Sequence, residues 1–183
     1  MELKHAIFNR RTIHKYSDTP VPIEVIEACI EAAHQAPNHR LTFPWHFTIA
    51  GPQTRTALFR SAVEMRRSMP GMTDKVEETI REKLLNPGGL VFVSLKKCED
   101  TFRAREDYAA ASCAIQNFML SAYGYGFGTK WSTGTLTRLD STYKIAEVNP
   151  DTHEIIGFIW VGEAVRVPSI ERPDVNEHKT VLN

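Results

Sequence analysis

The sequence has few cysteines, and none of them is placed to form a paired motif. Three occur in 183 residues, at Cys29, Cys98 and Cys113, with no CxxC spacing among them. Structural zinc sites and disulfide frameworks need cysteines in pairs at short, regular spacing. The composition therefore disfavours both, and a reducing compartment, the cytoplasm, is the expected location.

Long hydrophobic runs and an excess charge of one sign are also missing. The longest strongly apolar stretches, Leu90–Leu95 and Ile155–Val161, are far shorter than the roughly 20 residues that span a bilayer. The N-terminal segment is mixed and charged, unlike a signal peptide. Basic and acidic side chains both number 22, so the formal net charge is zero. We expect neither nucleic acid nor a membrane to be a main partner.

Motifs for the common nucleophilic, nucleotide-binding and metal-dependent chemistries are absent. The sequence contains no GxSxG elbow and no GxxxxGK[ST] loop. The glycines of Gly124–Gly128 follow a helical pattern, whereas a dinucleotide fingerprint needs a strand before its glycines. Pro37 separates His34 from His39, so these histidines do not form the helical i, i+4 pair of a zinc site. We expect no bound metal and no catalytic nucleophile from the protein.

Helix and strand patterns alternate along the chain, which indicates one α+β domain spanning residues 1–183. Apolar residues at helical spacing predict five helices, and threonines are expected to cap the third and fourth. Four of these helices are predicted over residues 2–9, 23–35, 54–68 and 103–123. The other is expected to be capped by Thr73 and to include Leu84.

Three segments carry strand patterns. Alternation predicts a strand over Trp45–Ile49, the apolar run Leu90–Leu95 predicts a strand covered on both faces, and Ile155–Val161 is the last predicted apolar strand. Beyond Gly162 the chain is polar and marked by prolines, so the tail 163–183 either frays or wraps around another surface.

The segment Arg10-Arg11-Thr12, with His14 shortly after it, is a candidate anion clamp. Two guanidinium groups and a hydroxyl lie within three residues, and arginine donates bidentate hydrogen bonds to phosphate. Taken alone, such a pair is more often an ordinary basic corner of the surface.

Two further segments carry polar groups beside predicted elements. Ala36-Pro37-Asn38-His39 forms a rigid connection between a helix and a strand, where binding groups are often held. Lys130–Gly134 offers backbone amides, two hydroxyls and an indole, which suit a planar heteroaromatic ligand. The alternatives are an ordinary connector for the first segment and a helix end followed by a strand for the second.

The order of these motifs resembles the nitroreductase family over nearly the whole chain. The resemblance implies a mixed central sheet flanked by helices and an intertwined homodimer whose tails 163–183 embrace the partner subunits. It also implies FMN at the interface, in contact with both subunits. The matching segments are residues 10–12, 20–22, 36–38, 44–47, 114–122, 126–128, 131–134 and 156–162.

The same resemblance implies which residues bind FMN. One group holds the phosphate and ribityl chain, a second reaches the flavin of the partner subunit, and a third lies beside the ring. The three groups are Arg10, Arg11 and Thr12; Gln35, Pro37, Asn38 and His39; and Trp131, Ser132 and Thr133.

His14 is a departure from the family, which commonly has lysine or arginine near the N1 edge of the flavin. Histidine carries a positive charge only when it is protonated. We therefore expect the flavin potential of this protein to depend on pH more steeply than in lysine-bearing relatives.

The implied activity is that of an FMN-dependent oxidoreductase, which uses NADH or NADPH in a ping-pong cycle to reduce nitroaromatic or quinone-type acceptors. Two alternatives stay open because fold does not fix function: a dehalogenase or desaturase of the same fold, and a non-catalytic FMN-binding dimeric protein. Residues 65–86 fall where family members vary, and we expect them to cover the site and select the acceptor.

Overall fold

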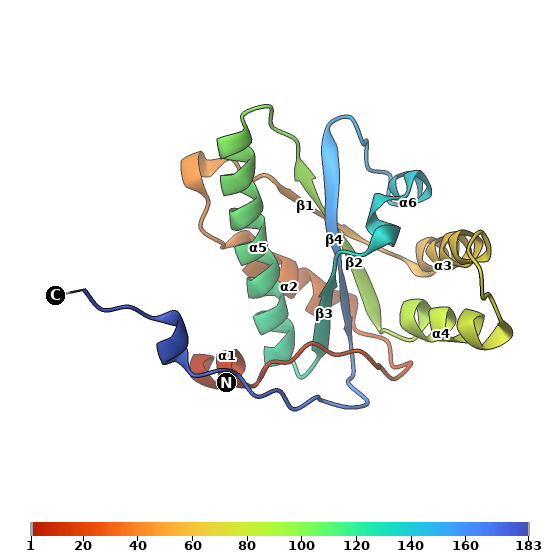
Figure 1. The fold of residues 1–183 in the computed structure, drawn as a ribbon, viewed down its shortest axis with the longest axis horizontal. Helices are drawn as coiled ribbons and strands as arrows, with labels where there is room; N and C mark the ends of the chain where they lie inside the picture. The colour runs from red at the N-terminus through yellow and green to blue at the C-terminus, as the bar shows by residue number, and fades with distance from the viewer. Residues whose placement is uncertain (1, 183) are drawn as a thin grey trace.

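The computed structural model describes residues 2–182 and shows a four-stranded sheet between two layers of helices (Figure 1). The helices are α1 (Leu3–Asn9), α2 (Ile23–His34), α3 (Pro52–Arg67), α4 (Asp74–Leu85), α5 (Thr101–Gly124) and α6 (Asp140–Ile145). The strands are β1 (Trp45–Ile49), β2 (Gly89–Lys96), β3 (Gly128–Ser132) and β4 (His153–Gly162). Short 3-10 helices are η1 (His39–Leu41), η2 (Thr135–Arg138) and η3 (Val175–His178).

The strand order is β1-β2-β4-β3, and every neighbouring pair is antiparallel. The predicted α+β class is confirmed. A mixed sheet also contains parallel pairing. Within residues 2–182, parallel pairing occurs only at a single bridge, between Thr12 and Thr129. This bridge places the segment after α1 against β3, at the open edge of the sheet.

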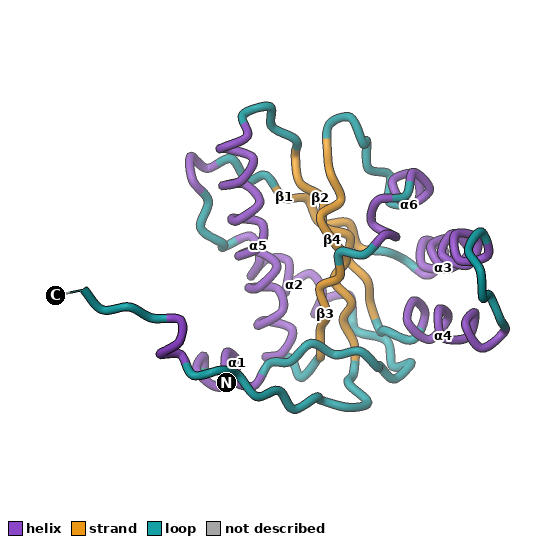
Figure 2. Tube along the Cα trace, in the orientation of Figure 1, coloured by secondary structure: helices purple, strands orange, loops and turns teal. Residues whose placement is uncertain are grey.

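Helices α2 and α5 cover one face of the sheet, and α3, α4 and α6 cover the other (Figure 2). Alternate residues of β2 enter the two resulting cores: Val91 and Val93 face α2 and α5, whereas Leu90 and Phe92 belong to the opposite core. Burial on both faces explains why this strand is an unbroken apolar run rather than an alternating one.

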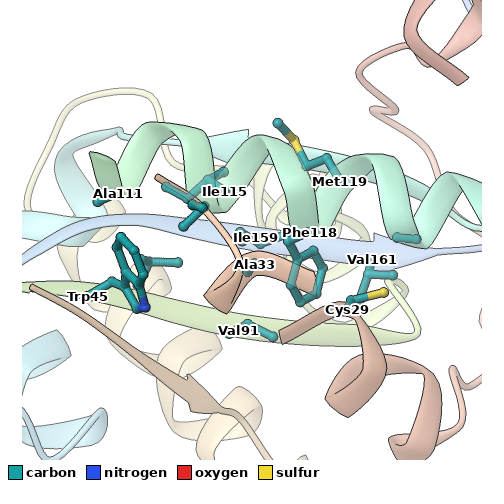
Figure 3. Close-up of a cluster of buried hydrophobic side chains, with 14 of the residues drawn as sticks. Cys29, Ala33, Trp45, Val91, Ala111, Ile115, Phe118, Met119, Ile159 and Val161 are labelled. Carbon is teal, nitrogen blue, oxygen red and sulfur yellow. The ribbon is translucent and has the colours of Figure 1, made fainter. Parts of the chain in front are cut away.

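The core on the α5 side depends on small residues as much as on large ones (Figure 3). Ala111 of α5 and Ala33 of α2 are fully buried, and they let the two helices approach each other closely. Phe118 fills the space between the helices and the sheet. Among the described residues, no helix has both the length and the apolarity to cross a membrane.

The helix boundaries differ from the predictions at one informative place. Helix α3 begins at Pro52, with Gly51 as its N-cap, and Thr54 therefore lies inside the helix instead of capping it. Proline suits the first helical position because its missing N–H has no intrahelical partner there. Thr73 does cap α4, since its side chain accepts a hydrogen bond from the Val76 amide.

Candidate functional site

The segment after α1 contacts the edge strand β3 through Thr12 and Ile13, and then pairs with the residues that follow β4. The amide of Ile13 donates to the carbonyl of Thr129 at 3.0 Å, next to the bridge formed by Thr12. A side chain on Gly128 would come within 2.4 Å of Ile13, so glycine permits this close approach. Thr12, from the predicted group 10–12, thus lies against β3, the strand that also contains Trp131 and Ser132.

Arg10 is the strongest candidate for binding an anion. Its Nη1 atom is buried and has no hydrogen-bond partner. Burial lowers the pKa of the Arg10 guanidinium, and the positive charges of Arg11 and Arg172 lower it further. A partly buried guanidinium next to like charges is unfavourable unless an anion joins it. Arg172 comes from the tail, and sequence reasoning did not single it out.

Arg11 has a second task in the folded chain. Its Nη1 atom donates to the carbonyls of Phe8 at 2.7 Å and of Arg10 at 2.9 Å. These bonds satisfy backbone acceptors at the C-terminal end of α1, where a positive charge is also favourable. Arg11 therefore holds the helix end in place, and only its remaining N–H groups are free for a ligand.

Residues on both faces of strand β4 hold the segment Trp131–Thr133 in place. The hydroxyl of Ser132 accepts a hydrogen bond from the Trp160 indole at 2.9 Å, on the face toward α4. On the α5 face the indole of Trp131 packs directly over Gly157, where a Cβ atom would lie 2.1 Å from its Nε1. Thr133 is exposed at the end of the strand. The segment is thus fixed before any ligand binds.

A cavity of about 150 Å³ lies beside this segment, on the face of the sheet covered by α4. It brings together His14 and Ser132, which belong to different predicted groups. Helix α4 contributes Lys83 and Leu84 to its wall, from the end of the 65–86 region that was expected to cover the site. The remaining lining residues are Tyr16, Lys130, Gly134, Leu136, Thr137, Phe158 and Trp160.

The loop that contains Asn38 is strained and locked by side-chain hydrogen bonds. Asn38 accepts from the Phe43 amide at 2.6 Å and donates to the Thr42 hydroxyl at 2.9 Å. Thr42 in turn donates to the buried carboxylate of Asp107 at 2.6 Å. Non-glycine residues rarely adopt positive φ, yet three do here: Arg40 (57°), Leu41 (53°) and Phe43 (42°). Asn38 therefore shapes the loop, while Gln35, Pro37 and His39 are exposed on it.

The Asn38 loop and the Arg10 segment lie at opposite ends of α5 (Figure 1). Thr42 of the loop donates a hydrogen bond to Asp107 near the start of the helix. Helix α1 contacts the end of the helix, where the Tyr123 hydroxyl and His5 Nε2 lie 3.3 Å apart. A rise of 1.5 Å per residue puts about 24 Å between Asp107 and Tyr123. One chain does not bring the predicted site residues together, so the prediction that the loop serves a partner subunit remains a prediction.

The structure is an α+β fold in which Arg10, Arg11 and Arg172 form a candidate anion site at one edge of the sheet. The model of the Nitroreductase family matches residues 7–163, and the chain belongs to this family. The family membership predicted from the order of the motifs is therefore confirmed.

Individual relatives agree with this assignment. The protein named "Putative NAD(P)H nitroreductase YfhC" from Bacillus subtilis (strain 168) is 34% identical over 172 residues, which cover 93% of this chain and 88% of YfhC. The structure of a nitroreductase-like family protein from Bacillus cereus matches with a TM-score of 0.86 at 21% identity, over 100% of this chain and 96% of that one. The FMN and NADPH-dependent nitroreductase NfnB from Sphigopyxis sp. strain HMH matches with a TM-score of 0.83 at 15% identity, over 100% of both chains.

Proposed function

We propose that the protein is an FMN-dependent oxidoreductase that takes electrons from NADH or NADPH and reduces nitroaromatic or quinone-type acceptors. The names of YfhC and NfnB support this activity class. The observation that carries the proposal is the buried, unpartnered Nη1 of Arg10, which lies beside Arg11 and Arg172 at the edge of the sheet.

The residues at this edge fit FMN in their chemistry. Arg10 and Arg172, with the free N–H groups of Arg11, would hold the phosphate, and Thr12 would donate its hydroxyl to the ribityl chain. Residues 131–133 and His14 would lie along the ring. From the partner subunit, the exposed residues Gln35, Pro37 and His39 would approach the same flavin, on the loop that Asn38 shapes.

Bound FMN supplies the hydride-transfer chemistry, and the protein supplies binding, orientation and electrostatics. Ser132 accepts from Trp160, which leaves its own proton free to be donated toward the cavity. Leu84 and Leu136 contribute apolar surface to the wall of the cavity. We propose a ping-pong cycle, in which NAD(P)H and the acceptor use the exposed side of the site in turn.

A homodimer is part of this proposal. Large apolar side chains are exposed on α1, on the outer face of α5 and along the tail, a pattern typical of surfaces that bind another protein. The described part of the tail, residues 163–182, leaves the sheet, runs past α1 and extends away from the body of the chain (Figure 1). The exposed apolar residues include Leu3, Phe8, Phe102, Tyr108, Val165, Val167, Ile170 and Val175. We propose that the tail wraps around the second copy.

A cytoplasmic location suits the cysteines. Cys29, Cys98 and Cys113 are all free thiols, as expected of a protein that works in a reducing compartment. Fractionation of the producing cells, followed by detection of the protein, tests this point directly.

The absorbance spectrum of the purified protein, recorded before and after anaerobic addition of NADH or NADPH, tests the proposal. A yellow protein that bleaches with either donor is the expected result. A yellow protein inert to both donors would instead be a non-catalytic FMN-binding protein or an enzyme that needs another donor, and a protein that takes up no FMN would overturn the proposal. Assays with nitrofurazone, menadione and iodotyrosine separate a reductase from a dehalogenase of the same fold.

Replacement of Arg10 tests the phosphate site. Arg10→Met should weaken FMN binding by about 10- to 100-fold, since a hydrogen bond to a charged group contributes roughly 1.5–3 kcal/mol. Arg60→Met, which removes an exposed arginine of α3, is the matched control and should leave the affinity unchanged. Equal FMN affinity in both variants would remove Arg10 from the site.

A further inference from the structure

The lining of the cavity beside β3 contains basic side chains but no acidic ones. His14 comes from the segment after α1, Lys83 from α4 and Lys130 from β3, and the lining includes no aspartate or glutamate. The ion pairs within residues 2–182 join Arg67 to Glu77, Arg81 to Glu78 and Arg103 to Asp107, so neither lysine of the cavity takes part in one. Three basic side chains from three separate segments thus converge on one small space.

Lys130 is not an ordinary surface lysine. It stands opposite Trp160 in the β3–β4 register and is partly buried. Burial lowers the pKa of its ammonium group, and the nearby charge of Lys83 lowers it further. Lys130 is partly buried, and the exposed Lys83 of α4 lines the same cavity, so both positive charges would stabilise an anion bound there.

The position of the cavity indicates which anion would bind there. Lys130 immediately precedes Trp131 and Ser132, and its side chain lines the same cavity as Ser132 and His14. These are the residues proposed above to lie along the flavin ring. A flavin ring gains negative charge when it is reduced, and that charge would arise next to the two lysines.

We propose that Lys130, reinforced by Lys83, is an electrostatic residue of the flavin site that stabilises the reduced over the oxidised cofactor. The proposal rests on the proposed function, because it requires FMN along residues 131–133. Histidine is charged only when it is protonated, whereas Lys130 and Lys83 add two ammonium groups to the same cavity. The potential of the flavin is then set largely by residues outside the matching motifs.

The test is the midpoint potential of bound FMN at pH 7 in Lys130→Met, together with the dissociation constants of oxidised and reduced FMN. Methionine keeps the apolar stem and removes the charge. We expect reduced FMN to lose about tenfold more affinity than oxidised FMN, which lowers the potential by about 30 mV for a two-electron couple. Lys130→Arg, which keeps the charge, should restore the wild-type potential.

Two further variants provide a second test and a control. Lys83→Met removes an exposed charge on α4, so it keeps the test decisive even if Lys130→Met fails to fold, and it should lower the potential by a smaller amount. Lys75→Met removes another exposed lysine of α4, outside the cavity lining, and should change nothing. A yellow protein whose potential is the same in wild type, Lys130→Met and Lys83→Met would overturn this inference alone. A wild-type protein that takes up no FMN would overturn the proposed function, and this inference with it.

Discussion

Gly157 of β4 is the position where the smallest change should disturb the proposed site most. A methyl group there would lie 2.1 Å from Nε1 and 2.6 Å from Cδ1 of the Trp131 indole, and 3.1 Å from the carbonyl oxygen of Ser132. Carbon atoms pack favourably at about 3.5 Å or more, so the indole must retreat by more than about 1 Å. Both affected residues belong to the segment proposed to contact the flavin.

The magnitude follows from the rigidity of the surroundings. Trp131 packs against the α5 core, and Ser132 is held by Trp160 on the other face, so neither residue has free room. Overpacking of this kind costs about 1–3 kcal/mol. Gly157→Ala should therefore lower the melting temperature, by about 2–4 °C for each kcal/mol of stability lost. Any strain released by moving the segment should appear as weaker FMN binding, tenfold for each ~1.4 kcal/mol.

Urea denaturation and FMN fluorescence titration measure the two effects separately. Gly134→Ala is the control for the stability measurement, because Gly134 lies next to the same segment and a Cβ atom there meets nothing within 4 Å. In the Gly157→Ala background, Trp131→Leu should restore part of the lost stability by removing the clashing indole. Wild-type stability and FMN affinity in Gly157→Ala would refute the reasoning.

Three further predictions concern the frame around the site. Thr42→Val should lower the free energy of unfolding in urea by about 1–3 kcal/mol, because it leaves the buried carboxylate of Asp107 without its hydroxyl donor; Thr42→Ser keeps the donor and should cost much less. Thr73→Ala removes the N-cap of α4 and should cost about 1 kcal/mol by the same measurement, whereas Thr73→Ser should be nearly neutral. Hydrogen bonds from two hydroxyl groups hold the pKa of Glu163 below its ordinary 4.5, so its stabilisation is present above that pH and is lost as the pH falls through the lowered pKa. Glu163→Gln should therefore flatten the acid side of the stability profile, and an unchanged slope would contradict this origin of the shift.

Elements with strong burial patterns could be predicted from the sequence. Helix α2, helix α5 and strand β2 lie within two residues of their expected bounds, because burial against both neighbours imposes the pattern on the sequence. Helix α6 was missed. Its place is set by tertiary hydrogen bonds, from the Thr142 hydroxyl to the Leu136 carbonyl and from the Ile155 amide to the Tyr143 hydroxyl. A short polar segment shows no periodicity from which such contacts could be read.

The candidate site also contains residues that the sequence could predict and residues that it could not. Local motifs pointed to Arg10 and to the segment 131–133, because clustered donors are visible in a few consecutive residues. Arg172 and Lys83 carry no local signal, since neither belongs to a motif of clustered polar donors. Only the fold brings the first toward Arg10 and the second toward Lys130. Charge that converges from distant segments is therefore the part of the site that sequence patterns do not reveal.

The length of α5 explains why the proposed flavin site needs two chains. Each chain carries the Arg10 segment at one end of this helix and the Asn38 loop at the other, about 24 Å apart by helical rise. A two-fold axis perpendicular to α5 reverses the direction of the second copy, so each loop would lie beside the arginines of the other chain. The loop is already locked through Asn38 and Thr42 within its own chain. Assembly would then complete two flavin sites without the added cost of ordering a flexible loop.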